Sequence, residues 1–142
     1  SLRRLFPDIE PATITAVINH TLRARDLYLL DSRVRNVEPT YIFNGFTSSF
    51  EESTLVFREY LTVDTIIFPL HTYFAIVLAH NPDAHGLAAY FFAHLTHLQT
   101  LAAEFKWDAV RQYHTLFFNR RSREMEANGD YSAWSRPDIQ LL

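Results

Sequence analysis

Cysteine is absent from the 142 residues of the sequence. Its absence excludes disulfide bonds, thiolate zinc sites and cysteine nucleophiles together. A chain without cysteine suits a reducing compartment, and we expect an intracellular protein, in the cytoplasm or the nucleus. Glycine is also scarce, and Gly45, Gly86 and Gly129 stand isolated from one another. Because a phosphate-binding loop needs clustered glycines, no such loop is predicted.

Long apolar runs and a basic excess are missing as well. No apolar stretch approaches the length of a membrane span, and the first residues do not lead into a signal-peptide core. We therefore expect no membrane partner. The formal net charge is −3, whereas a dedicated nucleic-acid binder usually has a basic excess. The overall charge therefore argues against that class, although a local basic patch can override it.

Large apolar side chains are abundant. Hydrophobic residues make up 48% of the chain, with 12 Phe, 7 Tyr and 2 Trp among them. Since each aromatic ring buries a large area, a chain of this length can build one compact core. We predict a single helical domain over residues 1–142, part of a longer protein. The predicted fold class is mostly α: a compact bundle of about four main helices with a small β-hairpin near residues 41–61.

Apolar spacing and helix-ending residues predict the four helices. The first begins at Pro11 and ends near residues 23–25, and the second begins at Pro69 and ends at Asn81-Pro82. The third covers residues 83–106. The fourth begins near Trp107 and ends at Asn128-Gly129, where glycine can adopt the left-handed cap conformation.

The hairpin prediction depends on two weaker patterns. Asn44-Gly45 is typical of a two-residue hairpin turn, and it lies between aromatic and β-branched residues. Residues 54–61 alternate between apolar and polar side chains, as a half-buried strand does.

Seven histidines raise a metal hypothesis. His94 and His97 are three residues apart on one predicted helix, and imidazoles at such spacing can bind zinc. The other candidate ligands are His71, His80, His85 and His114. However, the HExxH and GxSxG motifs are absent, and His94 falls in the apolar stripe of its helix. We therefore predict no enzyme, no catalytic residue, no metal, no cofactor and no small-molecule substrate. A histidine-dependent metal enzyme is the least favoured alternative.

A basic cluster near the end of the fourth predicted helix suggests nucleic-acid binding. Arg120, Arg121 and Arg123 provide guanidinium groups that suit phosphate, and Tyr131 and Trp134 can stack on bases. If this domain binds RNA or DNA, these five residues form the predicted interface. The structural interpretation is favoured, because cations near a helix C-terminus complement its dipole and a tryptophan after a helix commonly packs on the core.

Residues 107–134 read WDAVRQYHTLFFNRRSREMEANGDYSAW. This segment resembles Gag-like, nucleoprotein-type domains of fungal retrotransposons that encode a tyrosine recombinase. The matching positions are Trp107, Tyr113, His114, Phe118, Arg121, Arg123, Glu124, Met125, Gly129, Asp130, Tyr131, Ser132 and Trp134. Weaker similarity includes Phe68-Pro69-Leu70 and Phe6-Pro7. The chain departs from the family pattern at Ala133, where glycine is usual, and it lacks the family's Cys/His-rich cluster.

The resemblance implies a domain that assembles into oligomers or organises retroelement RNA, by analogy with Gag proteins. The predicted helix over residues 83–106 adds a physical reason, because Tyr90, Phe91, Phe92 and Leu95 cover nearly a full turn. Such a helix either forms the centre of a fold or is half-exposed at a partner surface. We predict self-association through these four residues, with a homodimer as the simplest form. The alternative is a monomer in which this helix is the core.

Overall fold

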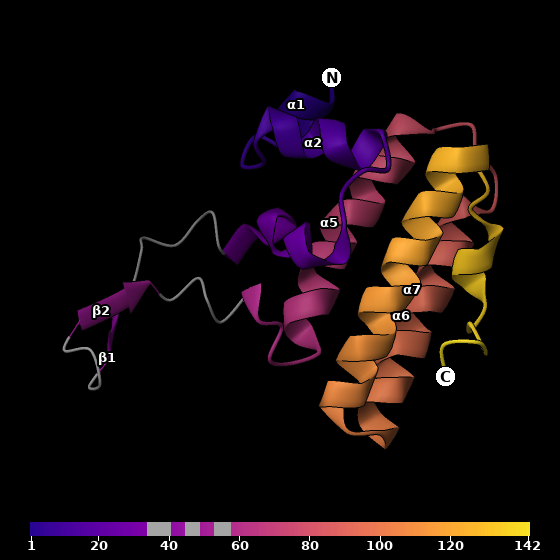
Figure 1. Cartoon of the computed structure of the whole chain (residues 1–142). Coiled ribbons are helices and arrows are strands. Elements are labelled where there is room, and N and C mark those ends of the chain that lie inside the picture. Colours follow the sequence, from indigo (N-terminus) through magenta and orange to yellow (C-terminus); the bar gives the residue numbers. More distant parts are fainter. Residues whose placement is uncertain (34–40, 45–48, 53–57) are drawn as a thin grey trace.

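Figure 1 shows the computed structural model of the chain, which describes residues 1–33, 41–44, 49–52 and 58–142. The N-terminal part contains α1 (Leu2–Leu5), α2 (Pro11–Ile18) and the 3-10 helix η1 (Ala24–Leu30). Strands β1 (Tyr41–Asn44) and β2 (Ser49–Glu52) follow. The remainder contains α5 (Asp64–His80), α6 (Leu87–Glu104), α7 (Trp107–Asn128) and the 3-10 helix η2 (Ser132–Ser135). The mostly helical fold class is confirmed.

The long helices α6 and α7 lie side by side and run antiparallel (Figure 1). Helix α5 packs against α6 on one side and against α2 and η1 on the other. After α7 the chain turns back, and η2 packs on α6. The C-terminal segment thereby lies along the pair of long helices and contributes to their core.

The predicted bundle of four helices with a β-hairpin near residues 41–61 is wrong. Five α-helices and two 3-10 helices occur in the described residues, and the described core is formed by helices and their connecting segments. The two four-residue strands pair only with each other, with Tyr41 opposite Glu52. A two-stranded sheet with four residues in each strand is too small to form a layer of the fold. Half of the predicted turn, Gly45, lies outside the described residues.

Of the predicted strand at residues 54–61, residues 54–57 lie outside the described part of the chain, and residues 58–61 do not form a strand. Residue 58 is helical, and residues 59 and 60 form a turn that leads towards α5. Tyr60 is buried in this turn, with a left-handed φ of 51°. Its hydroxyl donates to the carbonyl of Ala24 at 2.8 Å and accepts from the backbone N–H of Tyr28 at 2.9 Å. The inward side chain therefore anchors η1 and does not belong to a pleated strand.

The predicted helix boundaries agree best with the structure where a capping residue marks the end of the helix. The helix predicted from Trp107 to Asn128 is confirmed, and Gly129 is left-handed with its N–H bonded to the carbonyl of Met125. The start at Pro11 and the stop at Asn81 are also confirmed. The second helix, however, begins five residues before Pro69, at Asp64. Burial of residues on both sides of the proline outweighs its missing N–H.

Two other predicted boundaries are wrong. Helix α2 ends at Ile18, not near residues 23–25, because His20 adopts a left-handed φ of 59° that the helix cannot continue through. Helix α6 begins at Leu87, not at residue 83. The left-handed Gly86, with φ of 81°, directly precedes it.

Candidate interaction surfaces

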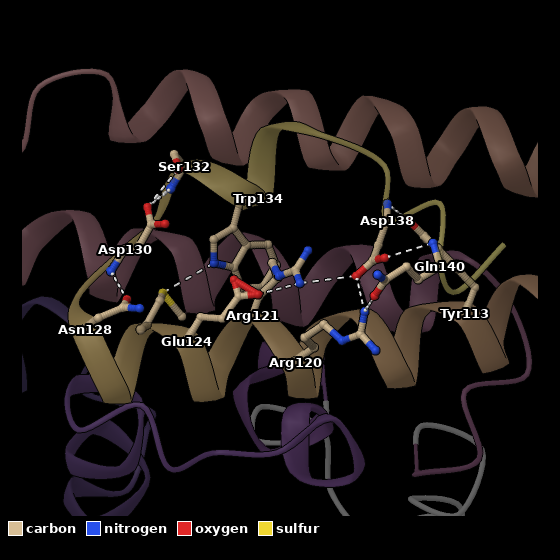
Figure 2. Close-up of polar contacts among 11 residues, drawn as sticks. Tyr113, Arg120, Arg121, Glu124, Asn128, Asp130, Ser132, Trp134, Asp138 and Gln140 are labelled. Carbon is tan, nitrogen blue, oxygen red and sulfur yellow. Dashed lines mark hydrogen bonds and ion pairs between the residues drawn. The ribbon is translucent and has the colours of Figure 1, made fainter.

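The predicted nucleic-acid residues Arg120 and Arg121 are held by the C-terminal segment (Figure 2). Their guanidinium nitrogens lie 2.8 and 3.2 Å from the same Oδ2 of Asp138. Arg121 also pairs with Glu124, and its guanidinium lies 4.8 Å from the ring centroid of Phe117. Both arginines therefore attach the chain end to α7 and do not form an open phosphate site.

Asp138 is the acceptor at the centre of this network. Its own N–H donates to the hydroxyl of Tyr113 at 3.0 Å, which positions the carboxylate over α7. Desolvation acts to raise the pKa of this carboxyl. The hydrogen bond and charge of Arg120 outweigh that effect, so the pKa lies below its ordinary value. Asp138 was not predicted as a site residue, because no local pattern connects it with arginines 17 and 18 residues away.

Arg123 differs from its two neighbours. It is exposed, and it makes no ion pair with a described residue. Glu126 bonds instead to Arg23 at 3.5 Å. Arg123 is thus the one arginine of the predicted basic cluster without an ion pair among the described residues. A single cation provides little affinity for a nucleic-acid backbone.

This difference predicts unequal effects of two identical substitutions. Arg121→Ala removes a side chain that is 8% exposed, together with its two ion pairs and its contact with Phe117. We expect the free energy of unfolding to fall by about 1–3 kcal/mol. Arg123→Ala is the matched control and should change it by less than about 0.5 kcal/mol. Urea denaturation followed by circular dichroism measures both, and equal effects would contradict the structural role of Arg121.

The aromatic residues of the predicted nucleic-acid interface point into the protein. Trp134 is 1% exposed, and its indole N–H lies 3.3 Å from the sulfur of Met125 (Figure 2). Tyr131 is partly buried, and its hydroxyl lies 3.4 Å from Nε2 of His20. Arg121 and Trp134 both lie beside Phe117 inside the fold. The ring of Trp134 is therefore not open for stacking on a base, and that of Tyr131 is only partly exposed.

The candidate metal ligands His94 and His114 are aromatic neighbours of core rings. His94 is stacked on Phe117, with ring centroids 4.6 Å apart, and His114 lies beside Phe118. Both histidines are 1% exposed, and their ring nitrogens have no hydrogen-bond partner in the described protein. Within the described residues, no group of three or more His, Asp and Glu side chains is arranged to hold a metal ion.

Burial controls the protonation of this histidine pair. Desolvation lowers the pKa of His114 to about 3. The pKa of His94 is lowered well below its ordinary value, first by desolvation and then by the nearby His114, His97 and Arg121. Both rings are therefore neutral at physiological pH and act as aromatic members of the core.

The four predicted self-association residues divide between the core and the surface. Phe91 and Leu95 are 1% and 6% exposed, because they pack inward from α6. Phe92 is 62% exposed, and Tyr90 is partly buried. Phe92 borders a small apolar hollow of about 230 Å³ between α5 and α6. Only one of the four predicted residues is thus fully available to a partner.

A larger apolar hollow lies between the end of α6, the first half of α7 and the last two residues. We call it the α6–α7 groove, and its volume is about 510 Å³. The residues that line it and carry the argument below are Leu101, Phe105, Val110, Tyr113, Leu116 and Leu142. Three of these are large and exposed: Phe105 at 58%, Leu116 at 50% and Leu142 at 65%. This surface was not among those predicted from the sequence.

No helix in the described part of the chain combines the length and the hydropathy that a bilayer crossing requires. Comparison of the chain with models of protein families, with curated proteins and with solved structures yields no match.

Proposed function

We propose that this chain is a non-enzymatic, Gag-like assembly domain that associates with further copies of itself. The observation that carries the proposal is the set of large apolar side chains left on the surface by an already complete core. In the described residues they are Leu5, Leu61, Phe68, Phe92, Phe105, Leu116, Ile139 and Leu142. Three of them surround one groove, and clustered apolar residues on a surface are typical of protein contacts.

The polar residues support the same proposal indirectly. The histidines suggested for metal binding are core rings or lie apart, and the two innermost arginines of the basic cluster are engaged with Asp138. A binding role based on apolar contact needs none of them. The resemblance of residues 107–134 to Gag-like domains adds a biological context, in which repeated copies assemble around retroelement nucleic acid. We do not propose a separate nucleic-acid-binding function, because no contact among the described residues favours it.

Self-association predicts a mass that depends on concentration. Size-exclusion chromatography with light scattering should give a mass above 16.6 kDa that rises from low to high micromolar protein. The free energy comes from apolar contact, so the effect should persist in high salt, which weakens exposed ion pairs. A strictly monomeric mass at high micromolar concentration contradicts the proposal.

A further inference from the structure

The C-terminal segment, residues 130–142, is attached to the helices at three points. Its attaching side chains are Tyr131, Trp134 and Asp138. The first lies against His20, with its hydroxyl 3.4 Å from Nε2 and the ring centroids 5.8 Å apart. The second packs edge-on against His94, with ring centroids 5.1 Å apart. Two of the three attachments are thus made to a histidine, the side chain whose charge ordinarily changes nearest to neutral pH.

The attached segment keeps a positive charge on His94 away from water. The ring is 1% exposed, and neither of its nitrogens has a hydrogen-bond partner among the described residues. Uncharged rings face it from the packed elements: Phe74 from α5, Phe117 from α7 and Trp134 from η2. The ionisable groups that act on it in the described part of the chain are all cationic when charged: His97, His114 and Arg121. Burial first, and then these groups, lower the pKa of His94.

His20 is affected in the same direction. Its Nδ1 is buried without a hydrogen-bond partner in the described protein. Glu126 on α7 favours its protonation, whereas His80 on α5 opposes it. The guanidinium of Arg23 donates to the carbonyl of His20 at 2.9 Å, which adds a further cation nearby. Desolvation is the largest effect and lowers the pKa of His20, so protonation is easier once Tyr131 moves away and water reaches the ring.

The third attachment responds to acid in a lower range of pH. The pKa of Asp138 already lies below its ordinary value, so its carboxylate stays ionised when the histidines begin to gain protons. Its partner Arg120 is 40% exposed, and an ion pair that is open to water holds a chain segment only weakly. A change in the segment in mildly acidic solution therefore comes from the histidines.

We infer that the C-terminal segment is a clamp that acid releases, because protonation of His20 and His94 detaches it while α5, α6 and α7 stay packed together. The released form binds more protons than the attached form, so its population rises as the pH falls. The helices have contacts of their own, such as the stacked rings of Phe74 and Phe91 at 4.0 Å between α5 and α6. This conformational change is independent of the proposed self-association.

Amide hydrogen exchange followed by NMR separates release of the segment from unfolding of the whole chain. The N–H of Trp134, bonded to the carbonyl of Tyr131 at 3.2 Å, reports on the segment. Amides in the middle of α7 report on the helices. From pH 6 to pH 5, after correction for the intrinsic exchange rate, protection of the Trp134 amide should fall about tenfold from His94 alone, with a further fall from His20. The α7 amides should keep their protection.

Three substitutions of histidine identify the groups that respond. His94→Phe keeps an aromatic ring on Phe117 and removes the titrating group, so the fall in protection should be about tenfold smaller. His20→Asn should also reduce it, and asparagine tolerates the left-handed φ of 59° at this position. His85→Gln is the control, because His85 is exposed in the turn before α6. It should leave the pH dependence unchanged.

A loss of protection that is confined to the segment and reduced in His94→Phe supports the clamp. Equal losses in the segment and in α7 would mean that acid unfolds the whole chain, which overturns the inference. Protection of the segment that does not change with pH overturns it as well, as does a His94→Phe variant that responds like the unsubstituted protein. Should His94→Phe fail to fold, His20→Asn provides the same comparison, and an unchanged response there counts equally against the clamp.

Discussion

Replacing Trp134 with alanine should lower the free energy of unfolding by about 3–5 kcal/mol, the range for a large aromatic residue removed from a core. The indole lies where the C-terminal segment enters the space between the three long helices. Its ring centroid lies 5.3 Å from that of Phe74 on α5, 5.1 Å from His94 on α6 and 5.7 Å from Phe117 on α7. Alanine leaves a cavity at the point where all three helices meet, and the rigid neighbours can close it only partly.

Chemical denaturation followed by circular dichroism measures this effect. Trp134→Phe keeps an aromatic ring and should lose much less stability. Phe105→Ala is the control for removing an aromatic side chain, because Phe105 is 58% exposed and belongs to the surface. It should change the free energy of unfolding of the dilute protein by at most about 0.5 kcal/mol. Similar losses for Trp134→Ala and Phe105→Ala would contradict the central position of Trp134.

Acidification should destabilise the protein in a range where most carboxylates remain ionised. In the unfolded chain His114 binds a proton near its ordinary pKa of 6.5, whereas burial keeps it neutral in the folded state down to about 3. The unfolded state therefore binds more protons between these values, and stability is lost as the pH falls below 6.5. Each pH unit costs about 1.4 kcal/mol per histidine, or about 2–3 kcal/mol for His114 between pH 6.5 and 4.5. The neutral, buried His94 acts in the same direction.

Unfolding free energies measured across this pH range should show the effect as a slope. His114→Leu replaces the titratable ring with an apolar side chain and should reduce the slope, with the larger benefit at low pH. Ile66→Val is the control, because Ile66 is a fully buried core residue without a titratable group and the change should lower stability equally at every pH. An unchanged slope in His114→Leu would mean that this ring is not held neutral by burial.

Much of the helical organisation followed from local chemistry. The helix from Trp107 to Asn128 was predictable because its apolar residues recur at helical spacing and Gly129 can adopt a left-handed conformation. The stop at Asn81-Pro82 was predictable for a similar reason. Pro69 gave the wrong start, because a local preference against proline inside a helix is weaker than the burial of Ile66, Ile67 and Leu70 around it.

The candidate surfaces were less accessible to sequence reasoning. Sequence spacing places Phe91, Phe92 and Leu95 on one helix, but it does not decide which of them faces another helix. Phe91 and Leu95 are buried because α5 and the C-terminal segment cover their side of α6. Phe92 lies outside this contact and is exposed. In the sequence Arg120 and Arg121 look like part of an open basic patch. Their ion-pair partner, Asp138, lies in the segment that returns onto α7, so sequence spacing does not reveal it.

By itself, the sequence determined the chemical limits of this protein: no disulfide or thiolate chemistry, an aromatic core and a mostly helical chain. These properties depend on which residue types are present and on their local spacing. Only the tertiary structure decided which residues share a surface. The return of residues 130–142 onto α6 and α7 buries Trp134, pairs two arginines with Asp138 and forms one border of the α6–α7 groove. Contacts between residues far apart in the chain decide these outcomes, and no local pattern encodes them.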